Sequence, residues 1–313
     1  MPVVDGHCDT LTVLSQQKRT LGMQSPHGHL DLPRLRKGGI DVQFFAVFVG
    51  PEYSSDPAGY VNEIIDLFNE EIKINQPEIE HVRCYRDIEN TLQKKKTSAV
   101  LTIEGGEALN GRIEQLDLFY NLGVRGLTLT WNGRNELADG VGMGPAANGL
   151  THMGRQVVQR MAALGMMIDV SHLAEPGFWD VITEVKAPVT ATHSNCRQIC
   201  DHPRNLTDKQ IKAVAESGGV IGVTYVPQFI DVNQPSIHRL LDHIDHIYKI
   251  AGISCIGLGS DFDGIDVTTE DLHDASVAVP NIACALSKRG YKTGEIEKIL
   301  GDNWLRLFKE VCG

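Results

Sequence analysis

Histidines and carboxylates directly follow short apolar segments at several separate places in this chain. The first is the stretch VVDGHCDTL near the start, where His7 and Asp9 come just after an apolar run. Alternate residues of an extended chain point to the same side, so His7 and Asp9 can reach one ion while Cys8 faces away. This spacing alone does not distinguish a metal-binding pair from an ordinary polar loop, so the rest of the sequence has to decide.

Polar residues in the same setting recur further along the chain. The whole set consists of three imidazoles and three carboxylates: His7, Asp9, Glu104, His172, His193 and Asp261. Mixed imidazole and carboxylate donors suit zinc. Six donors exceed the needs of one tetrahedral ion but fit two ions that share a carboxylate. Glu104 is the best candidate for the shared carboxylate, because its strand lies between that of His7 and Asp9 and those of the later histidines. Two adjacent metal ions can hold a hydroxide and hydrolyse an acyl bond.

These residues need a scaffold that brings distant segments together. Apolar segments of strand length occur at 2–7, 40–49, 98–105, 124–131, 166–172, 188–194, 219–226 and 255–262. Most are apolar nearly throughout, which is typical of strands buried on both faces of a parallel sheet. The sequence therefore predicts a parallel sheet of eight strands.

Helical patterns alternate with these predicted strands. Residues 58–75 have apolar positions at helical spacing, and a second helix has a cap residue at Thr151 and a terminating glycine at Gly165. Further helices are expected to start at Thr207 and to end at Gly252. Eight alternating units indicate a single α/β domain over residues 1–313, a (β/α)₈ TIM barrel.

A doubly wound open sheet is the alternative fold. This fold is less favoured because two motifs of nucleotide-binding sheets are missing. The first strand is not followed by G-x-G-x-x-G, and the chain has no G-x-x-x-x-G-K motif. In a (β/α)₈ barrel, the loops after the strands form the functional face. The six polar residues lie at the ends of five predicted strands, so they are expected around one mouth. The other three strands end near Phe48, Trp131 and Tyr225.

Composition excludes several classes of partner. The 313 residues carry a formal net charge of -11 without a block of Lys and Arg, which argues against nucleic acid and anionic membrane surfaces. No apolar run is long enough to span a bilayer, and the N-terminus lacks a signal-peptide pattern. Seven scattered cysteines then favour reduced thiols and a cytoplasmic location.

Six motifs occur in order along essentially the whole chain: DGHCDTL, TIEGGEAL, IDVSHL, THSNCR, HPRNLTD and GLGSDFDG. Together they resemble the renal (membrane) dipeptidase family, peptidase family M19 of the amidohydrolase superfamily, in its bacterial form. The resemblance implies a (β/α)₈ metallo-dipeptidase with two Zn²⁺ ions per chain. Its substrates would be small dipeptides, including those with a C-terminal D-residue. The family also suggests a homodimer, which no residue pattern in this chain shows.

The resemblance also implies roles for individual residues. His7 and Asp9 would bind the first zinc, His172 and His193 the second, and Glu104 both. Asp261 would shuttle a proton from the metal-bridging hydroxide to the leaving amine.

Other residues would contact the substrate. Arg204 would hold the substrate carboxylate through a bidentate pair, and Tyr225 would line the pocket. Trp131 stands where mammalian relatives have a histidine, so Trp131 or Asn132 would supply a hydrogen-bond donor or a pocket wall. Asp263 would bind substrate, orient Asp261 or only form a turn.

Two alternatives to a dipeptidase stay open. One is an amidohydrolase that acts on another small amide, such as an N-acyl amino acid or a lactam, and the departure at Trp131 favours it. The other is a non-catalytic metal-binding barrel, which predicts the loss of Glu104 or Asp261, although both are present. The pairs His27/His29 and His243/His246 are interpreted as loop and helix residues rather than ligands.

Overall fold

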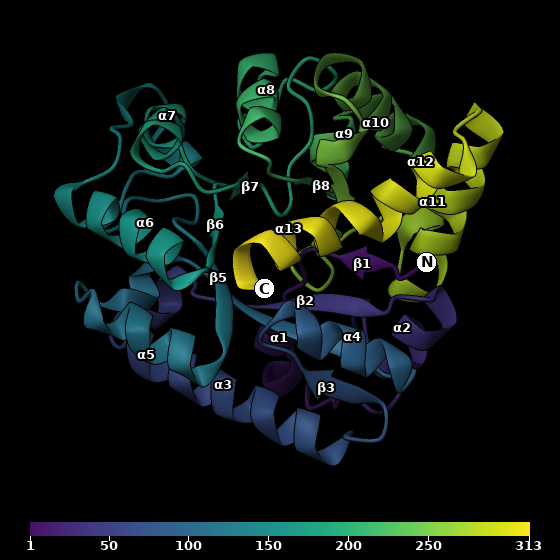
Figure 1. Cartoon of the computed structure of the whole chain (residues 1–313), viewed down its shortest axis with the longest axis horizontal. Helices are drawn as coiled ribbons and strands as arrows, with labels where there is room; N and C mark the ends of the chain where they lie inside the picture. The colour runs from purple at the N-terminus through teal and green to yellow at the C-terminus, as the bar shows by residue number, and fades with distance from the viewer.

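The strands of this protein form a nearly closed parallel barrel. The computed structural model describes residues 1–313, except for the side chain of Ser15. The barrel strands are β1 Val4–Asp5, β2 Val42–Phe48, β4 Thr97–Glu104, β5 Val124–Thr128, β6 Met167–Asp169, β7 Val189–Thr190, β8 Ile221–Val223 and β9 Ile256–Leu258. They are hydrogen-bonded in the order β7-β6-β5-β4-β2-β1-β9-β8, and a parallel bridge between Ala191 and Ile221 joins the two ends (Figure 1). The predicted (β/α)₈ barrel is confirmed.

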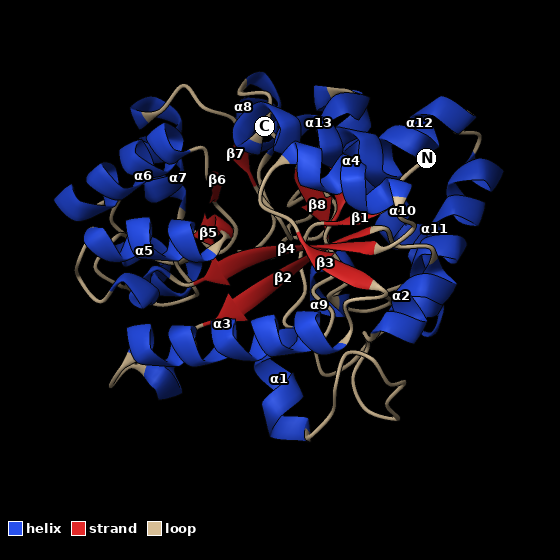
Figure 2. Cartoon of the chain, turned by 60° about the horizontal axis from the view of Figure 1, so that its bottom comes forward, coloured by secondary structure: helices blue, strands red, loops and turns tan.

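Helices surround this barrel, as Figure 2 shows. They are α1 Thr10–Gln17, α2 Leu32–Gly38, α3 Pro57–Ile74, α4 Tyr85–Gln93, α5 Glu114–Leu122, α6 His152–Leu164, α7 Glu175–Glu184, α8 Asp208–Glu216, α9 Pro227–Ile230, α10 Ile237–Ala251, α11 Ala275–Arg289, α12 Thr293–Glu297 and α13 Asn303–Cys312. None of these helices, over the residues described, is long and apolar enough to cross a bilayer.

The predicted caps of two helices are confirmed. The Thr151 side chain accepts a hydrogen bond from the backbone N–H of Gly154 at the start of α6, and Gly165 ends that helix with φ 73°. A residue without Cβ adopts this left-handed backbone at little cost. Thr207 caps α8 in the same way, by accepting from the backbone N–H of Gln210.

One strand was not predicted. β3, Ile79–His81, pairs in parallel with β4 outside the barrel path. It has only three residues, of which Glu80 and His81 are polar, so it lacks the apolar pattern that identified the other strands. The helix predicted at 58–75 is present as α3, before this strand, and α4 follows it.

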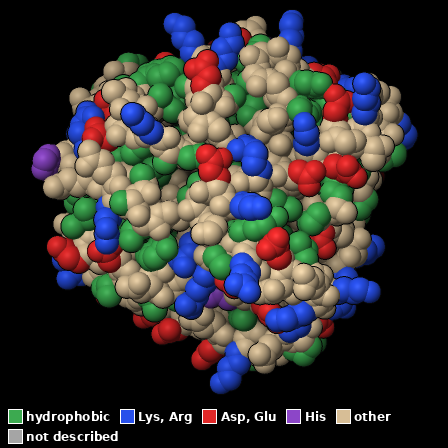
Figure 3. Space-filling view, in the orientation of Figure 1, with side chains coloured by type: hydrophobic (Ala, Val, Ile, Leu, Met, Phe, Trp, Pro, Cys, Tyr) green, Lys and Arg blue, Asp and Glu red, His purple; other side chains and the backbone are tan. Residues whose placement is uncertain are grey.

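The two ends of the barrel differ. Helix α13 packs against residues near the starts of the strands, among them Val42, Met167 and Val220. Its Trp304 donates an indole hydrogen bond to the carbonyl of Leu258 at 2.9 Å. Figures 1 and 3 view the molecule from this closed side, where acidic, basic and apolar side chains are interspersed. The opposite end, where the strands finish, is left for the site.

Candidate active site

The six predicted donors all lie at the carboxyl ends of barrel strands. His7 and Asp9 follow β1, and Glu104 is the last residue of β4. The other three come after later strands: His172 after β6, His193 after β7 and Asp261 after β9.

The backbone is strained at two of these positions. His172 has φ 64° and Asp261 has φ 65°, a left-handed region that residues with a Cβ rarely adopt. Strain of this kind persists where the surrounding structure enforces it and is frequent at functional sites. The chain therefore turns sharply after β6 and β9, so that both side chains are presented at the mouth.

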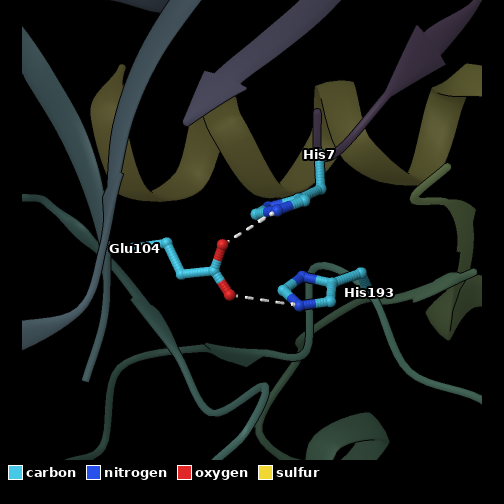
Figure 4. Close-up of side chains that lie close together, drawn as sticks. All are labelled: His7, Glu104 and His193. Atoms are coloured by element: carbon cyan, nitrogen blue, oxygen red, sulfur yellow. Dashed lines mark ion pairs between the residues drawn. The ribbon is translucent and has the colours of Figure 1, made fainter. Parts of the chain in front are cut away.

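Glu104 is the centre of the cluster. Its Oε2 lies 3.3 Å from His7 Nε2. Its Oε1 lies 2.9 Å from His172 Nε2 and 3.5 Å from His193 Nε2. Figure 4 shows the carboxylate reaching from β4 between the rings of His7 and His193. Because its two oxygens face different histidines, the carboxylate is placed as a bridging ligand would be.

The electrostatics of the cluster keep Glu104 ionised and two histidines neutral. Burial acts to raise the pKa of Glu104, but the charge of His7 and the close imidazoles of His172 and His193 hold it well below its usual range. Burial, followed by the charge of Arg204, lowers the pKa of His172 to about 3, and burial lowers that of His193. Neutral imidazoles carry the lone pair that a metal ligand needs.

Two carboxylates complete the other side of the cluster. Asp9 Oδ2 and Asp261 Oδ1 lie 3.5 Å and 3.8 Å from His7 Nε2. A Cβ on Gly264 would come within 2.1 Å of Asp9 Oδ2 and 2.6 Å of Asp261 Oδ1. Only glycine allows this approach, so Gly264 is part of the site. The sequence analysis missed it, although the motif GLGSDFDG ends on it.

The donors fit divalent metal ions. His7 Nε2 and Asp9 Oδ1 are buried and, within the part of the chain that is described, have no hydrogen-bond partner. Leaving such atoms unsatisfied is costly, and a cation would satisfy them. Two groups have ligand atoms within 4.8 Å of one another, His7/Glu104/His193 and His7/Asp9/Asp261. The arrangement can therefore hold more than one cation around Glu104 and His7.

Arg204 is a buried cation beside this cluster. It donates to the carbonyl of His193 at 3.0 Å and, at 3.4 Å, to Ser194 Oγ. Burial lowers its pKa to about 10, which still leaves the guanidinium charged near neutral pH. No described carboxylate lies within ion-pair distance of it, and its Nε has no partner among the described atoms. Such a group is suited to bind an anionic part of a ligand.

The aromatic and amide residues predicted for the substrate pocket take different positions. Trp131 packs edge-on against Phe48 with ring centroids 5.3 Å apart, so it is a wall of the mouth. Asn132 Oδ1 lies 2.8 Å from His172 Nδ1 and thus orients that histidine. Tyr225 is 1 % exposed and packs on Phe262. Its hydroxyl is buried and has no hydrogen-bond partner among the described atoms, and a substrate contact by Tyr225 stays a prediction.

Asp263 ties a loop to the mouth. Its carboxylate accepts hydrogen bonds from Thr10 Oγ1 at 2.7 Å, from Arg19 at 2.6 Å and from the backbone N–H of His29 at 2.6 Å. These bonds tie the segment 19–29 to the loop after β9. His27 and His29 lie outside helices and strands, as predicted. A direct contact of Asp263 with substrate stays a prediction.

A cavity of about 370 Å³ opens above the cluster. Residues that line it are Asp9, Thr12, Val13, Gln16, Phe48, Glu52, Glu104, Trp131, Asn132, His172, Val226, Phe229, Asp261, Asp263, Gly264 and Ile265. This volume is at the lower end of the range for small-molecule sites. The site can therefore admit a small molecule whose reactive bond reaches Glu104 and Asp261.

His243, which the sequence suggested to be a helix residue rather than a ligand, lies in the interior. Its Nδ1 accepts from the backbone N–H of Cys196 at 3.0 Å, and its Nε2 faces the carbonyl of Ile230 at 2.9 Å. Protonation of Nδ1 would break the first bond, and burial lowers the pKa of His243 to about 4.

This depressed pKa predicts a pH-dependent loss of stability. As pH falls from about 6.5 to about 4, His243 becomes protonated in the unfolded chain but stays neutral in the folded protein. The free energy of unfolding therefore decreases. We expect His243 to contribute about 2 kcal/mol of that decrease between about pH 7 and about pH 5. Urea unfolding of the metal-free protein measures it. His243→Gln should flatten the pH dependence by this amount, and His246→Gln, on the same helix, should not; equal slopes would contradict the assignment.

Comparisons with known proteins identify the family of this chain. The family model of membrane dipeptidases, peptidase family M19, matches residues 1–312. A solved dipeptidase described as a family M19 metallo peptidase is 29% identical, with a TM-score of 0.93 over 100% of this chain and 99% of that one. A Rhodobacter sphaeroides metallo peptidase, liganded with a phosphinate mimic of the dipeptide L-Ala-D-Ala, is 28% identical, with a TM-score of 0.91 over 99% of both chains.

An uncharacterized protein in the pqqA 5′ region of Klebsiella pneumoniae is 38% identical over 236 residues, which cover 72% of this chain and 86% of that protein. The match of the family model over nearly the full length, together with the likeness to these structures, means that this chain belongs to the membrane dipeptidase family, peptidase family M19.

Proposed function

We propose that the protein is a zinc-dependent dipeptidase that hydrolyses dipeptides with a free carboxylate, including those whose second residue is a D-amino acid. The observation that carries the proposal is the position of Glu104 between two groups of donors, with the charge of Arg204 beside them. The position of Glu104 suits a pair of metal ions, and the charge of Arg204 suits a substrate carboxylate a short distance away.

Two Zn²⁺ ions per chain fit the donors. His7 and Asp9 would hold one ion, His172 and His193 the other, and Glu104 would contact both. When bound, such ions polarise a carbonyl oxygen and make a water molecule nucleophilic near neutral pH.

Asp261 is the proposed proton carrier. Its side chain is 14% exposed and lines the cavity, with Oδ1 3.8 Å from His7 Nε2. A carboxylate at this position can accept a proton from the attacking water and deliver it to the amine that leaves. The sharp backbone turn at Asp261 directs this carboxylate into the cavity. There it would receive the proton in the first transfer and give it up in the second.

Arg204 is the proposed anchor for the substrate carboxylate. A guanidinium can bind a carboxylate through two parallel hydrogen bonds. Because Arg204 is fixed against His193, it sets a short distance between the anchored carboxylate and the bond that reacts. This geometry favours dipeptides over longer peptides. The Rhodobacter sphaeroides relative holds a mimic of L-Ala-D-Ala, which supports acceptance of a D-residue after the scissile bond.

Removing the anchor gives a direct test. We expect Arg204→Ala to raise KM for free-carboxylate dipeptides by roughly 10- to 100-fold, which corresponds to the loss of a charged hydrogen-bonded pair. The same dipeptides with an amidated C-terminus should be affected much less. Rates on a panel of L-L, L-D and amidated dipeptides, with metal content measured in parallel, provide the comparison.

The same panel separates the dipeptidase from its nearest alternative. N-acyl amino acids and lactams should be hydrolysed poorly. Preference for them over every dipeptide would contradict the proposed substrate class. An equal loss on free and amidated dipeptides in Arg204→Ala would contradict the anchoring role.

A further inference from the structure

A buried carboxylate accepts hydrogen bonds from residues next to the histidines of the cluster. Asp169, the last residue of β6, is 2 % exposed. Its Oδ1 accepts hydrogen bonds from the backbone N–H groups of Ser171 and Thr192, each at 2.9 Å. Its Oδ2 accepts from the hydroxyls of Thr128 and Thr192, each at 2.6 Å. Asp169 thereby joins the ends of β5, β6 and β7 directly beneath the site.

The environment of Asp169 favours its ionised form. Hydrogen-bond donors face both of its oxygens, and donors stabilise the charged carboxylate. Burial acts to raise the pKa of Asp169, but the hydrogen bonds from Thr128, Thr192 and Ser171 lower it below its ordinary value. The carboxylate therefore accepts hydrogen bonds and has no proton to donate.

The hydroxyl of Thr192 has only one hydrogen, and it donates this hydrogen to Asp169 in a hydrogen bond. The same oxygen lies 2.9 Å from Nδ1 of His193. Since Thr192 has no second proton to offer, His193 must be the donor in this contact, with the hydrogen on Nδ1. Its Nε2 then carries a lone pair and points into the donor cluster, 2.9 Å from His172 Nε2 and 3.5 Å from Glu104 Oε1.

We propose that Asp169 and Thr192 are positioning residues that hold His193 in the tautomer and orientation required for metal binding. The inference rests on the metal centre of the proposed function. Hydrogen bonds to the second nitrogen of a metal-binding histidine commonly fix its tautomer, and their loss typically lowers metal affinity 10- to 100-fold. His172 has a simpler arrangement, in which the amide oxygen of Asn132 takes the corresponding place.

The structure supplies a matched control. Thr128 and Thr192 are both buried threonines whose hydroxyls donate to Asp169 Oδ2 at the same distance. Only Thr192 also contacts imidazoles: its Oγ1 lies 2.9 Å from His193 Nδ1 and, more distantly, 3.5 Å from His7 Nδ1. Thr128→Val and Thr192→Val therefore remove equivalent bonds to Asp169, and they differ in the support given to His193.

The experiment measures binding of Zn²⁺ alone to the metal-free variants by competition with a chelator. Thr192→Val should weaken one of the bound Zn²⁺ equivalents by about 10- to 100-fold. Thr192→Ser, which keeps the hydroxyl, and Thr128→Val should bind nearly as the unmodified protein does. Thermal unfolding without metal should show similar losses for both valine variants. Equal Zn²⁺ affinity in Thr128→Val and Thr192→Val would overturn the positioning role.

A second measurement needs no substitution. Nitrogen NMR of the imidazoles in the metal-free protein should show His193 with its proton on Nδ1, and a proton on Nε2 would overturn the inference. Both measurements use no substrate, so they are distinct from the test of the proposed function. Weakened Zn²⁺ binding in Thr192→Val supports the positioning role even where the unmodified protein cleaves no dipeptide.

Discussion

Asp261→Asn is expected to lower kcat for dipeptides by roughly 10²- to 10⁴-fold, the usual contribution of a positioned acid–base group, while the protein keeps its bound metal. Asparagine has nearly the shape of aspartate, but its amide cannot take up and release a proton near neutral pH. Because Asp261 Oδ1 lies 3.8 Å from His7 Nε2, metal content has to be measured on the same preparation.

The exposed Asp266 lies on the same loop and provides the control, since Asp266→Asn should leave turnover unchanged. Two outcomes would contradict the proton-carrier role. Unchanged turnover in Asp261→Asn would exclude it directly. Loss of one metal equivalent would instead make Asp261 a ligand, as its grouping with His7 and Asp9 allows.

Glu104→Gln is expected to have the largest effect of any single substitution at the site, because it removes the charge shared by both groups of donors. Glutamine offers one neutral oxygen in place of two charged ones, so it cannot face His7 and His172 at once as Glu104 does. We expect loss of most bound metal and dipeptide turnover below detection. Elemental analysis together with hydrolysis rates measures both effects.

Glu107 offers a matched control on the following turn. It is a half-buried acid, whereas Glu104 is buried. Its Oε2 accepts from Asn135 at 3.1 Å rather than facing the histidines. Glu107→Gln should therefore keep the metal content. A Glu104→Gln protein that retained two metal equivalents would show that Glu104 does not bridge them.

The barrel could be predicted from the sequence because its strands are buried on both faces. Runs such as 219–226 are apolar almost throughout, and this pattern follows directly from burial. The pattern failed at β3, which lies outside the barrel path and is partly polar. It also overestimated strand length, as in 166–172, where only Met167–Asp169 is strand. The residues that follow turn sharply to present His172, and hydrophobicity does not record such a turn.

The ligand cluster could be predicted because its members come at strand ends, and a barrel brings strand ends together. The supporting residues could not be predicted in this way. Thr192, Asp169 and Gly264 act through contacts between distant segments, and their types are common in ordinary loops and strands. Asn132 was expected to supply a hydrogen-bond donor or a pocket wall; it lines the cavity, and its oxygen contacts His172. That second contact could not be predicted, because only the folded geometry reveals which atom a side chain approaches.

The central claim is that bound metal at this cluster cleaves dipeptides. The most direct test is to titrate the metal-free protein with Zn²⁺ while following hydrolysis of L-L and L-D dipeptides. We expect hydrolysis to appear with added Zn²⁺ and to reach its maximum at about two equivalents per chain, the number that the ligand set can hold. A protein that binds no Zn²⁺, or that hydrolyses dipeptides equally well without it, would contradict this account.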